Sequence, residues 1–464
     1  MRTMRQPPDE QSDAGRRMYA LIEELFPICR SITGDGIRET LRRLSCHIPL
    51  DIVEVPSGTQ VFDWTVPKEW NIRDAWIANA RGERVVDFAA SNLHVVSYSV
   101  PVRRRMSLAE LRPHLHALPD HPDWIPYRTS YYKESWGFCL SQRTLDSLPE
   151  DLYEVCIDSS LEPGHLTYGE HVVRGKSEQE ILLSCHCCHP SLANDNLSAL
   201  AVAVELARRL GEMAAELEYT YRFLFIPGTI GSITWLARNP DAAARVRYGL
   251  VMSCLGDEGA LTYKSSRRGD TLVDRAAAHV LGRRGEEGRV RAFVPYGYDE
   301  RQYCSPGFNL AVGCLTRTPN GEFVEYHSSA DDLSFVQPES LADSLSVCER
   351  IIEVLEHDGT FINLSPWCEP QLGRRGLYRA TGGAGLPEYE MALLWVLSYS
   401  DGAFTLLDIA ERAGIDFHIV RKAAADLAAC TLLRPASARA AAAQALAFGY
   451  DQRSPVPVVN GAVR

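Results

Sequence analysis

Two side chains that can bind a metal ion, His186 and Asp195, bracket the segment between a predicted strand and a predicted helix. The apolar run EILLSC ends directly before His186, and the helical pattern NLSALAVAVELARRL begins directly after Asp195. A neutral imidazole and a carboxylate are common ligands of zinc. Taken singly, His186 fits a buried core histidine and Asp195 fits a helix N-cap, a frequent role of aspartate. Together, at one strand end, they favour a metal site.

A second histidine and further acids follow other predicted strands. The run GLVMSCL is followed by Asp257, a third candidate ligand, and the segment EYHSSADDL contains His327. Its acids Asp331 and Asp332 are close enough in sequence to support the His327 ring by hydrogen bonds. Mixed imidazole and carboxylate ligands with one shared carboxylate suit a two-zinc hydrolytic site, where a metal-bound water attacks and the second ion polarises the carbonyl. We therefore expect one or two zinc ions here.

The run His186-Cys187-Cys188-His189 also suggests a structural zinc site of the finger type. Its four residues are too tightly bunched for the usual spacing of paired ligands, and no second pair of cysteines stands nearby. We therefore predict that Cys185, Cys187 and Cys188 are small buried hydrophobic residues.

The candidate residues lie in a region with the pattern of an α/β fold. Four short apolar runs, EILLSC, YRFLFIP, GLVMSCL and NLAVGCL, alternate with helical patterns. This alternation predicts a mostly parallel mixed sheet flanked by helices. In such sheets ligands bind outside the carboxyl ends of the strands, which is where the metal candidates stand.

Changes in the pattern of apolar and turn-forming residues divide the chain into four predicted parts. Residues 1–48 are predicted to be helices of the α/β domain, and residues 49–170 an inserted β-rich domain of short runs separated by Pro, Gly and Asp. Residues 171–385 form the α/β domain itself. Residues 386–464 hold three short helices at the spacing of a winged helix-turn-helix, followed by an Ala-rich and then Pro/Val-rich tail.

A winged helix would ordinarily indicate DNA binding. Thr405 is expected to cap its second helix, Gly414 to end it, and Asp416 to cap the third helix. That third helix, DFHIVRKAAADLAAC, offers only Arg421 and Lys422 as phosphate partners in an acidic chain. We therefore expect a packing role, or contact with a protein partner or a second copy of the chain, and consider nucleic acid the least favoured partner.

The β-rich region contains an aromatic cluster of Tyr131, Tyr132, Trp136 and Phe138. Core packing is the simplest explanation for these residues. If the region folds over the metal site, some of them would instead line a substrate pocket.

Composition limits the class of protein. The 464 residues carry a formal net charge of -12, which argues against general nucleic-acid binding. The polar start MRTMRQPPDEQSDAGRR has no secretory pattern, and no apolar run is long enough to span a membrane. The 13 cysteines lack the spacing of a disulfide framework, so reduced thiols in the cytoplasm are expected. The expected partner is a small-molecule or peptide substrate.

Several motifs resemble a known family. HCCHPSLANDNLSALAVAVELA and EYHSSADD are similar to the metal-binding segments of the co-catalytic zinc aminopeptidases. PICRSITGDGIRETL, SYYKESWGFCLS, DERQYCSPGFNL and CEPQLGRRGLY more closely resemble a bacterial aminopeptidase-like group with an inserted β-domain and a C-terminal winged helix. The resemblance covers nearly the whole chain. It implies the α/β fold of zinc exopeptidases and assigns His186, Asp195 and His327 as metal ligands, with Asp257 or Ser253 at the fourth position.

One residue departs from that family. Gly228 in Ile226-Pro227-Gly228 stands where the group carries a glutamate that accepts a proton or binds the second zinc. Loss of a positioned general base typically costs about 10²–10⁴-fold in rate. Another acid could serve instead, and the candidates are Glu300 and Glu258 as catalytic residues, besides Asp257 and Glu325. Alternatively the site holds one metal, or it no longer hydrolyses peptides.

Two functions therefore compete. The first is a zinc-dependent, aminopeptidase-like hydrolase that cleaves an amide or peptide bond of a small substrate, such as a biosynthetic intermediate. Glu300 is an acid that could hold the free ammonium group of such a substrate. The alternative is a catalytically weakened binding or regulatory protein, which Gly228 favours.

Overall fold

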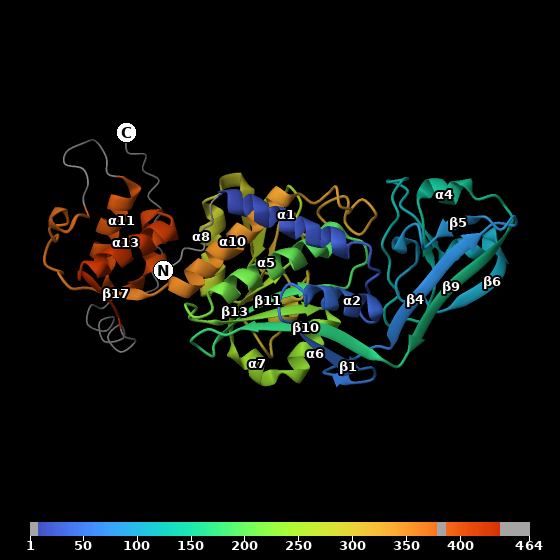
Figure 1. The fold of residues 1–464 in the computed structure, drawn as a ribbon, viewed down its shortest axis with the longest axis horizontal. Helices are drawn as coiled ribbons and strands as arrows, with labels where there is room; N and C mark the ends of the chain where they lie inside the picture. Colours follow the sequence, from blue (N-terminus) through green and yellow to red (C-terminus); the bar gives the residue numbers. More distant parts are fainter. Residues whose placement is uncertain (1–7, 378–386, 437–464) are drawn as a thin grey trace. The chain divides into compact units, whose positions relative to one another are not determined.

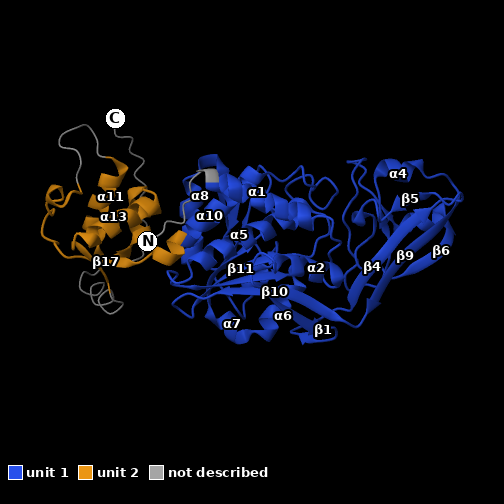
Figure 2. Cartoon of the chain, in the orientation of Figure 1, with its two compact units in different colours: residues 1–352 blue, residues 353–464 orange. Residues whose placement is uncertain are grey.

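The chain divides into two compact units, residues 1–352 and 353–464 (Figure 2). The computed structural model describes residues 8–377 and 387–436 of the 464. The Ala-rich and Pro/Val-rich tail lies outside the described residues. Among those that are described, no helix combines the length and the apolar character needed to cross a bilayer.

A mixed sheet of eight strands forms the centre of the first unit. Its order is β1-β10-β12-β11-β13-β16-β14-β15, and β11 pairs in parallel with both neighbours, as β13 does with β16 and β14 with β15. The three remaining pairs are antiparallel. The strands are β1 (Asp51–Pro56), β10 (His165–Val173), β11 (Glu180–His186), β12 (Thr220–Ile226), β13 (Val246–Met252), β14 (Leu261–Lys264), β15 (Gly288–Arg291) and β16 (Val312–Thr316).

Helices cover both faces of this sheet, and its central strands are therefore buried along their whole length and mostly apolar. Every residue of β11 and of β12 is buried. Figure 1 shows α1, α5 and α10 on one face and α6 and α7 on the other. The helices of this unit are α1 (Pro8–Leu25), α2 (Asp35–Leu44), α3 (Leu108–Leu111), α4 (Gln142–Ser147), α5 (Ala199–Glu212), α6 (Ile230–Arg238), α7 (Pro240–Arg245), α8 (Leu272–Gly282), α9 (Glu300–Tyr303) and α10 (Pro338–His357), the last of which runs past the boundary between the units.

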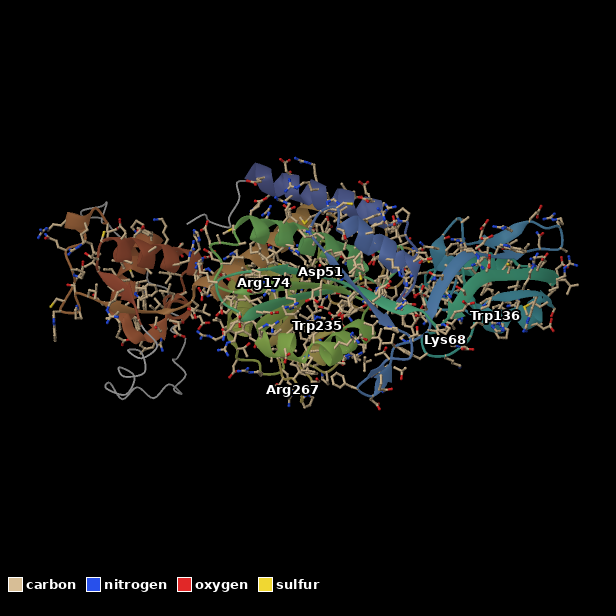
Figure 3. The ribbon with its side chains drawn as sticks, turned by 60° about the horizontal axis from the view of Figure 1, so that its bottom comes forward. Asp51, Lys68, Trp136, Arg174, Trp235 and Arg267 are labelled. Carbon is tan, nitrogen blue, oxygen red and sulfur yellow. The ribbon has the colours of Figure 1, made fainter. Side chains whose placement is uncertain are left out.

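The packing under the sheet includes a buried cation over an aromatic ring. Trp235 of α6, labelled in Figure 3, is fully buried, and the Arg222 guanidinium of β12 lies 6.0 Å from its ring centroid. Arg222 is also paired with Glu180 of β11, its Nε atom lying 2.5 Å from Oε2. The two central parallel strands are therefore joined by an ion pair as well as by their backbone hydrogen bonds.

The predicted β-rich region forms a second sheet of four strands in the order β5-β4-β9-β6. It contains β4 (Glu69–Ala78), β5 (Arg84–Asp87), β6 (Val102–Ser107) and β9 (Leu152–Glu162), with the short strands β2 (Gln60–Val61), β3 (Trp64–Thr65), β7 (Leu115–His116) and β8 (Phe138–Cys139) beside it. Strands β1 and β10 flank this region in the chain and pair with each other at the edge of the large sheet. The domain boundaries chosen from the sequence stay a prediction.

Beyond the end of α10, the described residues of the second unit form three α-helices and a three-stranded sheet. Thr405 caps α12 with a capping box, Gly414 ends it in the left-handed conformation, and Asp416 caps α13, as predicted. The elements are β17 (Thr360–Asn363), α11 (Glu388–Tyr399), β18 (Asp401–Thr405), α12 (Leu406–Ala413), α13 (Phe417–Ala429) and β19 (Leu433–Pro435).

Candidate metal centre

The site begins at the carboxyl ends of the central strands. His186 is the last residue of β11 and is paired in register with Ile226, the last residue of β12. Chain segments that leave neighbouring parallel strands at this edge converge, which places Gly228 after β12 beside His186 and Cys254 after β13 beside Asn196.

Asp195 lies in an irregular turn, Ala193–Ser198, that leads into α5. It is not a conventional N-cap, because its carboxylate makes no capping hydrogen bond to the helix and faces imidazole rings instead. Its own backbone N–H donates to Asp331 Oδ2 at 2.9 Å. The neighbouring Asn194 N–H donates to Asp331 Oδ1 at 2.6 Å. Asp331 was expected to support the His327 ring, and instead it holds the backbone of the turn that carries Asp195.

Two asparagines tie this turn to the segment after β13. Asn196 Oδ1 accepts from Cys254 N–H at 3.0 Å, and its Nδ2 donates to the carbonyl oxygen of Met252 at 3.2 Å. Asn194 Oδ1 accepts from Gly256 N–H at 2.8 Å. These bonds fix the turn on both sides, and Asp195 is therefore presented at one defined position.

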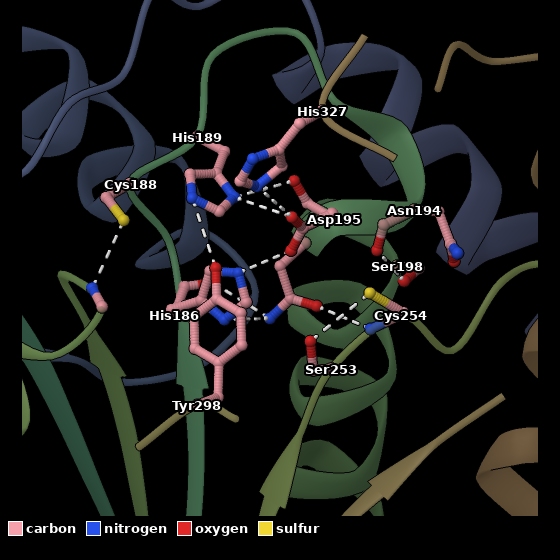
Figure 4. Close-up of polar contacts among 12 residues, drawn as sticks. His186, Cys188, His189, Asn194, Asp195, Ser198, Ser253, Cys254, Tyr298 and His327 are labelled. Carbon is pink, nitrogen blue, oxygen red and sulfur yellow. Dashed lines mark hydrogen bonds and ion pairs between the residues drawn. The ribbon is translucent and has the colours of Figure 1, made fainter. Parts of the chain in front are cut away.

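Three imidazoles surround the Asp195 carboxylate (Figure 4). His186 Nε2 lies 2.8 Å from Oδ1, His189 Nδ1 lies 3.2 Å from Oδ2, and His327 Nε2 lies 3.1 Å from Oδ2. The sequence-predicted ligands His186, Asp195 and His327 are thus brought together across more than a hundred residues of chain.

Burial sets the protonation of this cluster. Burial lowers the pKa of His186 to about 4 and also lowers the pKa of His327. Burial alone would raise the pKa of Asp195, but the surrounding imidazoles hold it well below its usual range. Neutral His186 and His327 beside an ionised Asp195 are the protonation states that a metal ion requires.

His189 was not among the predicted ligands. The His-x-x-His spacing of the HCCH run was its signal in the sequence, and that run was judged only as a zinc finger. The His189 backbone oxygen accepts from the fully buried Arg30 Nε at 2.8 Å. The Arg30 Nη1 donates to the Leu25 oxygen at 2.6 Å, so that the end of α1 positions the His189 loop.

Tyr298 is the second residue that the sequence did not indicate. Its ring stacks on His186 with centroids 3.8 Å apart, and its hydroxyl lies 3.3 Å from His189 Nε2. Burial raises the pKa of Tyr298 well above its usual value, so the phenol stays protonated and acts as a hydrogen-bond donor.

Tyr298 also fills the space in front of Gly228. A Cβ atom at position 228 would lie 3.2 Å from Tyr298 Cε1 and 3.7 Å from His186 Cβ. The Gly228 backbone N–H lies 3.3 Å from Cys188 Sγ. The position of the missing acid is therefore next to the cluster, and an aromatic ring occupies the adjoining volume.

Three predicted site residues lie outside the cluster. Asp257 Oδ2 accepts from Asn194 Nδ2 at 2.9 Å, and its Oδ1 accepts from Thr318 Oγ1 at 2.7 Å. Glu258 is exposed. Glu300 is fully buried and paired with Lys264, and it accepts from Tyr298 N–H at 3.2 Å. Asp257 and Glu300 thus hold neighbouring loops in place, and the structure does not bring them to the imidazoles.

Backbone strain is concentrated around the cluster. His327, Thr229 and Cys254 adopt left-handed conformations with φ of 56°, 64° and 49°. Such conformations cost about 1–3 kcal/mol each and persist where surrounding bonds over-determine them. Thr229 N–H donates to Asp299 Oδ1 at 2.7 Å, and Cys254 is held by Asn196 as described.

A cavity of about 390 Å³ opens beside the cluster and includes His189, Gly228 and Arg301 in its wall. Its aromatic wall consists of Trp64, Tyr131, Tyr132, Tyr296, Tyr298 and Tyr326. Part of the aromatic group in the β-rich region therefore lines a pocket, whereas its Phe138 is buried in the core and its Trp136 stacks on His114.

The donor set fits a metal ion. Ligand atoms of His186, His189 and Asp195 lie within 4.8 Å of one another, and all three residues are buried. All 13 cysteines, each within the described residues, carry free thiols, and the HCCH cysteines are buried as predicted. Burial raises the pKa of Cys188 to about 12, which disfavours the thiolate form that would bind zinc.

Two protein-family models match the chain. A domain of unknown function (DUF4910) matches residues 19–358, and a winged helix-turn-helix matches residues 359–435. A Clostridium acetobutylicum protein, provisionally named for polysaccharide biosynthesis and for an aminopeptidase-like domain, is 52% identical over 424 residues. The match covers 91% of this chain and 97% of that protein.

Two solved structures are also similar. The crystal structure of a provisionally assigned peptidase from Clostridium acetobutylicum has a TM-score of 0.87 at 51% identity and covers 92% of this chain and 98% of that chain. The structure of a zinc aminopeptidase from Bacillus subtilis has a TM-score of 0.54 at 11% identity and covers 73% and 94%. The predicted fold, a zinc exopeptidase-like α/β domain with a C-terminal winged helix, is confirmed.

Proposed function

This chain belongs to the DUF4910 family, and we propose that it is a zinc-dependent hydrolase that cleaves an amide or peptide bond of a small substrate. The observation that carries the proposal is the buried group of His186, His189 and Asp195, with the half-buried His327 bonded to it, beside a cavity. The fold shared with zinc aminopeptidases supports the choice of metal and of reaction class. The name of the Clostridium relative supports a biosynthetic intermediate as substrate.

We propose one zinc ion per chain rather than two. Ligand atoms of His186, His189 and Asp195 lie close enough together to hold one tetrahedral ion, whose fourth position would stay open for water or substrate. A second ion would need further acids, but Gly228 has no side chain and Asp257 is bonded to Asn194 and Thr318. When bound, zinc polarises a carbonyl group and lowers the pKa of water.

The chain's own residues would then act on the substrate amide. Tyr298 O–H stands at the cavity wall as a donor, because its pKa is raised, and it would donate to a carbonyl oxygen on which negative charge develops. Glu300 and Lys264 fix the loop that carries Tyr298. The aromatic wall would exclude water from the reacting bond. The 13 free thiols support the cytoplasm as the compartment.

Metal analysis and hydrolysis test this function together. Full-length protein purified without chelators should contain about one zinc per chain and cleave members of a panel of aminoacyl amides and N-acyl amino acids. His186→Ala and His189→Ala should remove both metal and activity, whereas the exposed His47→Ala should change neither. Absence of metal, or cleavage that survives His186→Ala, would rule out the zinc hydrolase.

The second candidate is a catalytically weakened binding or regulatory protein. Gly228, with Tyr298 filling the adjoining space, is the observation that favours it. In that case the protein would contain about one zinc per chain, but it would cleave no amide in the panel.

A further inference from the structure

The charge of the residues that line the cavity beside the metal centre limits the ligands that it can take. Among the described residues that line it there is no aspartate and no glutamate. Within the described part of its wall, Arg301 is the one side chain with a permanent charge. A pocket that receives the free amino terminus of a peptide needs a carboxylate to pair with the ammonium group, and this wall does not supply one.

Two acids near the cavity, Glu300 and Asp299, do not line it. Glu300 is paired with Lys264 and accepts from the Tyr298 N–H. Asp299 Oδ1 accepts from Thr229 N–H at 2.7 Å and from Ser232 Oγ at 2.9 Å. Recruiting Glu300 to an ammonium group would therefore break bonds that hold the cavity wall. Asp299 Oδ2 has no hydrogen-bond partner among the described residues, but it is buried and Asp299 does not line the cavity.

Arg301 is placed to receive an anion. It lies on α9, whose backbone is fixed by the bond from Gln302 N–H to the Asp299 oxygen and by the buried Tyr303, which is hydrogen-bonded to Ser184. The Arg301 Nε atom is buried and has no hydrogen-bond partner within the part of the chain that the structure describes. Arg301 also lines the cavity, and its guanidinium is always charged and carries several N–H donors that suit a carboxylate or phosphate.

The mouth of the cavity is aromatic and exposed. Trp64, Tyr132 and Tyr296 line it and are 41%, 52% and 76% exposed. Trp64 and Tyr132 contact each other edge to face with centroids 5.2 Å apart. Exposed rings of this kind provide flat apolar faces for a ring or an apolar chain of a ligand.

We propose that this cavity takes an anionic amide, whose carboxylate or phosphate group is bound by Arg301 and whose ring or apolar part packs on the aromatic mouth. Substrates with a free amino terminus are disfavoured at this site. The designation of this ligand as substrate rests on the proposed hydrolase, whereas the anion site rests on Arg301 and the cavity wall alone.

Binding of matched aromatic probes to the full-length, zinc-loaded protein tests the anion site. Benzoate and phenyl phosphate share one ring with benzylamine, which is a cation at neutral pH. Calorimetry should show binding of at least one anion and at least about tenfold weaker binding of benzylamine. The tighter of the two anions identifies carboxylate or phosphate as the preferred group. Tighter binding of benzylamine on the unmodified protein would overturn the proposal.

The variant Arg301→Gln tests whether the anion binds to the arginine or to the metal. It should weaken anion binding by at least about tenfold, whereas Arg289→Gln, an exposed arginine on β15, should leave it unchanged. Anion binding that is unaltered in Arg301→Gln would place the anion on the zinc and overturn the role of Arg301.

Cleavage of hippurate, hippuramide and leucinamide distinguishes this proposal from the proposed reaction. We expect zinc-dependent cleavage of hippurate, with a KM that rises at least about tenfold in Arg301→Gln and a smaller change in kcat. Preferential cleavage of leucinamide, unchanged in Arg301→Gln, would contradict the proposed anionic substrate but would still support the proposed hydrolase. Anion binding that depends on Arg301, without cleavage of any amide, would support the anion site and count against the hydrolase.

Discussion

Gly228 and Tyr298 compete for the same volume beside His186. The tyrosine ring stacks on the imidazole and lies 3.2 Å from where a Cβ atom of residue 228 would be. A glutamate at position 228 would have to displace that ring, because a close-packed wall does not accept several more atoms without movement. The lack of a side chain at position 228 and the position of the Tyr298 ring therefore depend on each other.

This coupling makes a prediction about restoring the acid. Gly228→Glu alone should not raise the rate of amide cleavage, and it should lower the zinc content because it pushes Tyr298 against His186. In a Tyr298→Ala background, Gly228→Glu should cleave at least about 10²-fold faster than Gly228→Gln, which has the same shape but accepts no proton. The comparison needs steady-state rates and zinc content for Gly228→Glu, for Tyr298→Ala and for the two double variants. A gain from Gly228→Glu alone would show that Tyr298 moves freely.

Asp257 illustrates how a predicted ligand can have a structural role. Its carboxylate is bonded to Asn194, Thr318 and the Gly259 N–H, and these bonds join the turn of Asp195 to the strand ends. Asp257→Asn should therefore destabilise the fold by about 1–3 kcal/mol and leave the zinc content unchanged. Asp195→Asn should lose the metal. Denaturation curves and metal analysis of both variants check this, and loss of zinc from Asp257→Asn would restore it as a ligand.

At the scale of secondary structure elements, most of what positions the site could be predicted from the sequence. Apolar runs located β11, β12 and β13, and strand ends in a parallel sheet must converge, which was enough to join His186 to Asp195. The loop before α9 could not be predicted in this way. Its path depends on Glu300 meeting Lys264, and that contact turns Glu300 away and Tyr298 toward His186. His189 was missed because neighbouring cysteines suggested another kind of site.

Helix packing in the first unit leads to a pH prediction. Arg17 of α1 and Arg208 of α5 each lie 2.7 Å from the Glu205 carboxylate. Burial alone would raise the pKa of Glu205, but these arginines lower it to about 2. Because the folded pKa lies below the unfolded value, the stabilisation is present above about pH 4.5 and is lost as pH falls toward about 2.

The variant Glu205→Gln measures this contribution. It should be less stable than the unmodified protein by about 3 kcal/mol at neutral pH, and the difference should shrink as pH falls from about 6.5 to about 3.5. Chemical denaturation followed by tryptophan fluorescence gives the free energies. The exposed Glu216→Gln should show no such pH-dependent difference. A difference that stays constant with pH would mean that packing, not charge, explains the loss.

At the scale of the whole molecule, the two units differ in what they offer to a ligand. All residues of the metal centre lie in the first unit, within residues 186–327. The second unit has the form of a DNA-binding module, yet it belongs to a chain with a net charge of -12. DNA affinity is dominated by cations that neutralise phosphates, so the decisive question is whether the cations of its α13 are available.

Those cations are paired within the unit. Arg421 Nε lies 3.0 Å from Glu353, and Lys422 Nζ lies 2.7 Å from Asp426. We therefore predict that the full-length protein does not bind double-stranded DNA in mobility-shift assays at about 50 mM salt, where phosphate contacts are strongest. Replacing the two acids, in Glu353→Gln with Asp426→Asn, would release both cations and should produce weak, salt-sensitive binding without sequence preference. Tight, sequence-selective binding by the unmodified protein would contradict this prediction and would mean that the winged helix recognises DNA. If the unmodified protein does not bind DNA, contact with another protein or with a second copy of the chain is the role that we propose for this unit.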